Sequence, residues 1–74
     1  MCGIVGITSN KSVTSSIINS LRKLEYRGYD SAGIATLEDG FINEVKCEGR
    51  VDNLEKNLSK KKLLGNVGIG HVRW

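Results

Sequence analysis

At its N-terminus the chain reads MCGIVGI (residues 1–7), a cysteine in second place followed by a short apolar run. Residues 4–7 predict a buried strand that would hold the terminus rigidly, whereas chain ends are normally loose. Removal of Met1 would leave Cys2 as the first residue, and its own α-amine could then take the thiol proton near neutral pH. The alternative is that Cys2 is only a small, buried apolar residue.

Two helices are expected further along the chain. Apolar residues recur at helical spacing from Val13 to Leu24, and Ser12 is in place to act as the N-cap. A second, short helix is expected over residues 51–59, because Asp52 and Glu55 have the spacing of a capping pair at a helix start.

Strand patterns occupy most of the remaining chain. Residues 33–37 and 41–47 are separated by Asp39-Gly40, and an Asp-Gly pair between two such runs predicts a β-hairpin. Alternation along residues 41–47 makes Cys47 a packed or edge residue. A glycine-rich apolar strand is expected over residues 67–74.

Length and cysteine content limit the possible classes of protein. Seventy-four residues form at most one small domain. Cys2, Cys47 and a single histidine cannot supply four zinc ligands, so no metal site is expected. The chain has neither a signal peptide nor a membrane-spanning segment, and we therefore expect a cytoplasmic protein with reduced thiols. A Cys2–Cys47 disulfide is the alternative that the composition leaves open.

The net charge of +3 comes largely from Lys56 and the run at residues 60–62. Such a run could contact nucleic acid, but no aromatic residues interleave with the lysines and no nucleic-acid motif accompanies them. Lysines near the C-terminal end of a helix interact favourably with the helix dipole and keep an exposed turn solvated. We expect no nucleic-acid partner.

Residues 26–33, YRGYDSAG, carry more reactive and polar side chains than is usual for a loop that joins a helix to a strand. Gly28 can end a helix in a conformation with positive φ. A plain helix end explains Gly28 and leaves the side chains around it unexplained. The last residue, Trp74, is large and apolar and has nothing after it to pack against, which suggests that the chain is cut off inside a domain.

Three motifs together resemble one enzyme family, the class II glutamine amidotransferases, which are N-terminal-nucleophile hydrolases. They are MCGIVG (1–6), LEYRGYDSAG (24–33) and GHVRW (70–74). The resemblance implies an α+β fold that is part of a four-layer αββα sandwich. Residues 1–74 would be the truncated N-terminal part of the amidotransferase domain, without the sugar-isomerase domains that follow in one branch of the family.

The resemblance also implies roles for five residues. Cys2 would attack the side-chain amide of glutamine, while Arg27 and Gly28 would complete the catalytic pocket. Arg73 would pair with the α-carboxylate of the substrate, and Trp74 would form the pocket wall. No cofactor is implied. Asp30 is expected to have a structural role.

Within the family, the Arg-Gly-Tyr-Asp form at residues 27–30 favours the branch that passes ammonia from glutamine to fructose 6-phosphate. Full-length members of this branch are homo-oligomers. Val72 departs from the family pattern, which has threonine at this position. Because the oxyanion hole and the acceptor-sugar domain are missing, the 74 residues alone should be inactive. The alternative is a non-catalytic gene remnant, or a fragment that acts only by associating with other chains.

Overall fold

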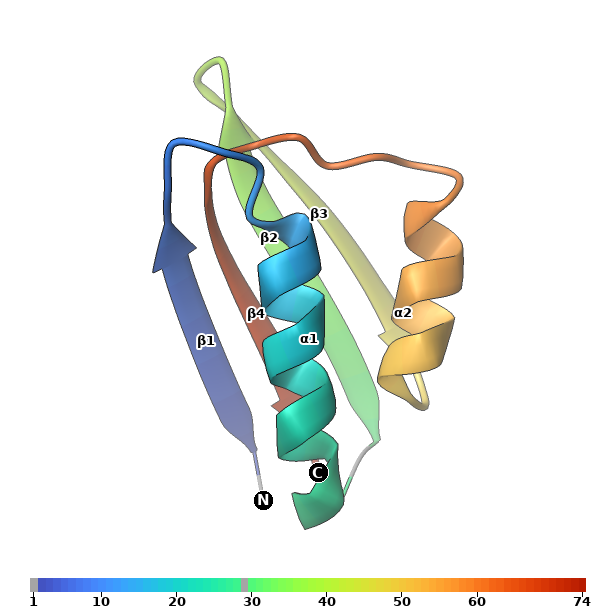
Figure 1. The fold of residues 1–74 in the computed structure, drawn as a ribbon. Coiled ribbons are helices and arrows are strands. Elements are labelled where there is room, and N and C mark those ends of the chain that lie inside the picture. Colours follow the sequence, from blue (N-terminus) through green and yellow to red (C-terminus); the bar gives the residue numbers. More distant parts are fainter. Residues whose placement is uncertain (1, 29) are drawn as a thin grey trace.

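The computed structural model describes residues 2–28 and 30–74, which form one antiparallel sheet with helices on one of its faces (Figure 1). The elements in chain order are β1 (Gly3–Thr8), α1 (Thr14–Leu24), the 3-10 turn η1 (Glu25–Arg27), β2 (Ser31–Glu38), β3 (Phe41–Glu48), α2 (Val51–Leu58) and β4 (Val67–Arg73). The expected α+β class is confirmed. Within these described ranges no helix is long and apolar enough to cross a membrane.

The strand order in the sheet is β1-β4-β2-β3, so the last strand of the chain lies between the first two. Every neighbouring pair is antiparallel; Gly3 lies opposite Val72, and Ser31 lies opposite Arg73. The start of β1, the start of β2 and the end of β4 therefore meet at one end of the sheet. Figure 1 shows the start of β1 and the end of β4 at this end.

The core lies between the sheet and the two helices. Strand alternation turns Ala32, Ile34 and Val72 toward the helices. The buried apolar residues form one cluster: Val13, Ile17, Ile18, Leu21, Ala32, Ile34, Val51, Leu54, Leu58, Leu63 and Val72. The apolar stripe expected between Val13 and Leu24 is therefore confirmed as the inner face of α1.

The opposite face of the sheet is uncovered among the described residues and carries large apolar side chains beside charged ones such as Glu44 and Lys46. Ile4, Ile69 and Ile42, from three different strands, are 80%, 59% and 75% exposed. Shallow apolar hollows on this face are lined by side chains such as Ala35 and Ile69. The sheet thus has one packed face and one open face.

The expected N-cap of the first helix is wrong. The helix α1 begins at Thr14 with Val13 at the N-cap position, and no side chain caps it. The hydroxyls of Ser12 and Thr14 instead donate to the carbonyl of Leu63, at 3.4 and 2.6 Å. The segment between α2 and β4 passes close to the helix start, and its carbonyl accepts from both hydroxyls.

The expected capping pair of the second helix is also wrong. The helix α2 begins at Val51, and both Asp52 and Glu55 pair with Arg22 of α1 rather than with the backbone of their own helix. The hairpin between β2 and β3 is confirmed. Asp39 and Gly40 at its turn have φ values of 51° and 82°, as a turn with two positive φ angles requires.

Candidate functional site

The three sequence motifs meet at one end of the sheet, where the third motif, on β4, lies between the first, on β1, and the second, which ends on β2. Cys2 directly precedes β1, and Arg73 is the last residue of the central strand β4. Since Gly3 lies opposite Val72, the next step along the same antiparallel register pairs Cys2 with Arg73. Cys2, which carries the thiol, and Arg73, which carries the guanidinium, are therefore neighbours on two adjacent segments of the sheet.

The two cysteines have different surroundings. Cys2 is exposed and Cys47 is half-buried on β3, and both thiols are free, so the disulfide left open by the composition is not formed. Burial raises the pKa of the Cys47 thiol, because a thiolate loses solvation there. At a given pH a smaller fraction of Cys47 is therefore ionised, which disfavours it as a nucleophile.

Gly28 and Trp74 are in direct contact. Gly28 follows η1 with φ 114° and ψ 163°, and its position lies against the indole ring. A Cβ at Gly28 would stand 2.6 Å from Cδ2 of Trp74. Only glycine allows the ring to approach this closely. Gly28 thus joins the second motif to the third, while Trp74 remains 67% exposed.

The backbone of Asp30, in the loop between η1 and β2, is hydrogen-bonded to two other parts of the chain. Its N–H donates to the carbonyl of Arg73 at 2.7 Å, and its own carbonyl accepts from the N–H of Gly49, also at 2.7 Å. Arg73 is exposed, and alternation puts it on the open face of the sheet with Ile69 and His71. Its guanidinium is thus not buried in the helix-packed core.

The remaining predicted residues are only partly described. The backbone of Arg27 lies in η1, and its side chain lies outside the described part of the structure. Met1 and Tyr29 are outside the described residues altogether. The roles predicted for Arg27 and for the α-amine of Cys2 therefore stay predictions.

Sequence reasoning missed Glu25, the first residue of η1. Its carboxylate accepts a hydrogen bond from the N–H of Val51 at 2.9 Å and lies 3.8 Å from Nε of Arg50, with a side chain only 14% exposed. A glutamate at the end of an amphipathic helix is expected to be solvated. The available signal was that Glu25 is part of the motif LEYRGYDSAG (24–33).

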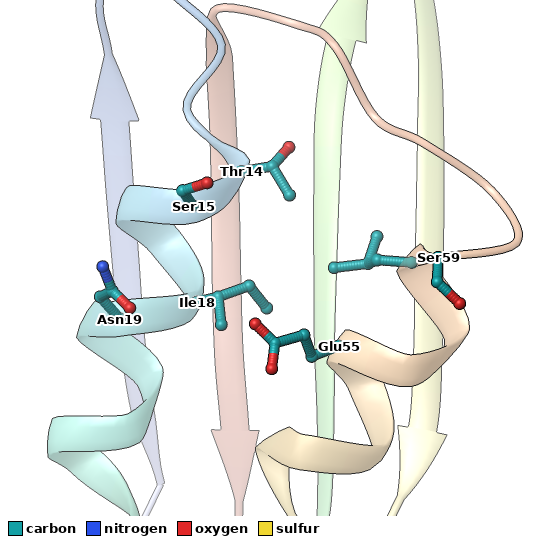
Figure 2. Close-up of a pocket in the computed structure, with 7 residues that line it drawn as sticks. Thr14, Ser15, Ile18, Asn19, Glu55 and Ser59 are labelled. Atoms are coloured by element: carbon teal, nitrogen blue, oxygen red, sulfur yellow. The ribbon is translucent and has the colours of Figure 1, made fainter.

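A separate groove of about 410 Å³ lies between α1 and α2 (Figure 2). Ile18 and Glu55 point toward each other across it, and it contains no cysteine. It is thus distinct from the site at the sheet end. No cluster of three or more His, Cys, Asp or Glu side chains within residues 2–28 and 30–74 could hold a metal ion.

No protein-family model matches the chain. Individual relatives do, over its whole length: it is 57% identical to the glutamine–fructose-6-phosphate aminotransferase (isomerizing) of Clostridium acetobutylicum. The chain corresponds to the N-terminal segment of this aminotransferase. The aminotransferases of Bartonella henselae and Clostridium tetani are 54% and 51% identical to it over the same 74 residues. The chain spans 12% of the length of each of these aminotransferases.

Proposed function

We propose that residues 1–74 are the N-terminal part of a class II glutamine amidotransferase domain and supply its nucleophile, Cys2. The observation that carries the proposal is the meeting of Cys2, Gly28 and Arg73 at one end of the sheet. An exposed thiol on a residue that neighbours an arginine suits a substrate that has both an electrophilic carbonyl and a carboxylate. Glutamine has both groups.

In the proposed reaction this chain supplies the nucleophile, its base and a partner for the substrate carboxylate. After removal of Met1, the α-amine of Cys2 takes the thiol proton, and the sulfur attacks the side-chain amide carbon of glutamine. The protonated α-amine then gives this proton to the amide nitrogen as the C–N bond breaks, so that ammonia leaves and a glutamyl thioester remains. Water hydrolyses the thioester to glutamate and restores the thiol. Arg73 pairs with the α-carboxylate, and Gly28 and Trp74 form the adjoining wall.

The acceptor substrate is inferred from the relatives, and the remaining layers of the sandwich are inferred from the open face of the sheet. The name of the relatives implies glutamine and fructose 6-phosphate as substrates of a full-length enzyme. The open face supports a further layer of structure and hence the four-layer αββα sandwich. Because the chain spans 12% of these relatives, we expect the 74 residues alone to be inactive. The cytoplasmic location and the homo-oligomeric state stay predictions.

A chimera tests the proposal. Residues 1–74 would replace the matching segment of the Clostridium acetobutylicum enzyme, and release of glutamate and formation of glucosamine 6-phosphate would be measured. Cys2→Ser should lower glutamate release by roughly a thousandfold or more, because the nucleophile is lost. Cys47→Ser is the matched control and should leave the activity near that of the unsubstituted chimera. Full activity in the Cys2→Ser variant would overturn the proposal.

A fragment that acts only by association with other chains is the second candidate, and the open face favours it. The intact mass of the native protein that carries this N-terminus separates the two. A species several times larger and without Met1 supports the amidotransferase. A species near 8.1 kDa supports the fragment.

A further inference from the structure

The turn between β3 and α2 holds the loop that carries Gly28 at both of its ends. At the start of the loop, the Glu25 carboxylate accepts from the N–H of Val51 at 2.9 Å. At its end, the carbonyl of Asp30 accepts from the N–H of Gly49 at 2.7 Å. Both ends of the loop are thus hydrogen-bonded to the same short segment, residues 49–51.

Glu25 also connects this turn to the site through its own backbone. Its carbonyl accepts from the N–H of Gly28 at 2.9 Å, which closes η1 and sets where Gly28 begins. Gly28 in turn lies against the Trp74 ring. A continuous series of contacts therefore links the first N–H of α2, through Glu25 and Gly28, to Trp74, the residue after β4.

The carboxylate is well suited to this role. A carboxylate that accepts from a free N–H in the first turn of a helix makes a charge-assisted hydrogen bond and is favoured by the helix dipole. The Glu25 side chain is only 14% exposed, so water has little access to the contact, and the guanidinium of Arg50 lies nearby. No side chain caps α2 from its own N-cap residue. Glu25 thus supplies a cap from a distant part of the chain.

We propose that Glu25 is a positioning residue of the glutaminase site: by binding the first turn of α2, it holds Gly28 and Trp74 in register with Cys2. This inference rests on the proposed function. It assigns no contact between Glu25 and the substrate. Its effect should therefore appear in the rate of the chemical step more than in substrate binding.

The test uses the chimera described above and the variant Glu25→Ala. We expect kcat for glutamate release to fall by about tenfold or more with a small change in KM, because small displacements of a reacting geometry are costly. Glu25→Gln keeps an acceptor oxygen for the N–H of Val51 and should restore most of the rate. If Glu25→Ala does not fold, Glu25→Asp replaces it, since aspartate keeps the charge and shortens the reach.

Glu55→Ala is the matched control. It removes another carboxylate of the α1–α2 region, the one paired with Arg22, and leaves the loop untouched. At equal loss of melting temperature, only the Glu25 variant should lose kcat, and only it should speed hydrogen exchange in residues 25–30. Equal kcat losses in both variants, or unchanged exchange in residues 25–30, would overturn the inference. An inactive unsubstituted chimera would count against the proposed function instead, and the exchange measurement would still decide the anchoring.

Discussion

At the scale of single residues, Gly28 has the most restrictive environment of the site. Its φ of 114° and ψ of 163° fall in a region that is essentially confined to glycine, and the Trp74 ring occupies the space that a side chain would need. Backbone conformation and packing thus require the same residue type independently. Few of the other glycines combine both constraints.

Gly28→Ala should destabilise the loop, by about 1–3 kcal/mol from the backbone alone and more from the collision with Trp74. In the chimera we expect a lower melting temperature together with lost glutamate release. Thermal unfolding and the glutaminase assay measure the two effects.

Gly40→Ala is the control for this prediction. Gly40 also has a positive φ, 82°, but apart from its chain neighbours no heavy atom of the described residues lies within 4 Å of the position that its Cβ would take. The variant should lose some stability and keep its activity. Equal effects of both substitutions would show that the contact with Trp74 is unimportant.

At the scale of elements, the close approach of α1 to β4 shapes the fold. A Cβ at Gly70 would collide with the Ile17 side chain and lie 3.2 Å from Cδ1 of Leu21. Ile17 and Leu21 are completely buried. The helix can therefore lie close to the central strand only because that strand has glycine beneath it.

Gly70→Ala should lower the free energy of unfolding by about 1–3 kcal/mol, because the added methyl forces α1 away from the sheet. Chemical denaturation of the chimera, followed by circular dichroism, measures this change.

Gly6→Ala is the matched control, since it adds the same methyl to a strand on the open face, where the nearest atom is 3.9 Å away. We expect its free energy of unfolding to stay within about 1 kcal/mol of the unsubstituted protein. A loss as large as that of Gly70→Ala would contradict the packing argument.

At the scale of the whole molecule, the sheet has a packed face and an open face. Large apolar side chains from several strands are exposed together on the open face, and β1 and β3 are its edges. Contiguous apolar patches and unpaired strand edges favour association. The fold of these 74 residues thus leaves apolar side chains and strand edges exposed on one face.

The isolated 74-residue chain should therefore self-associate, and Ile69→Lys, at the centre of the open face, should reduce the association. Sedimentation velocity at several concentrations measures the change. Asn57→Lys, on an exposed position of α2, adds the same charge elsewhere and should have little effect. A chain that is monomeric without either substitution would contradict the prediction.

The order of the elements follows from local sequence pattern. Helical spacing in residues 13–24 and the Asp39-Gly40 turn predict their elements correctly, because each depends on residues close together in the chain. The resemblance in three motifs predicts site roles for Cys2, Gly28 and Arg73, and these roles stay predictions. The helix caps failed, because Ser12 and Asp52 had partners elsewhere in the fold.

By itself the sequence predicted the helices and the hairpin from local pattern, and it indicated the α+β class and Cys2 as the candidate nucleophile through the family resemblance. Only the folded chain determined that β4 lies between β1 and β2, which brings Arg73 beside Cys2. It alone determined that Glu25 binds a helix that begins 26 residues later. The physical reason is the same in both cases: hydrogen bonds between distant segments depend on packing, which the spacing of residues along the chain does not encode.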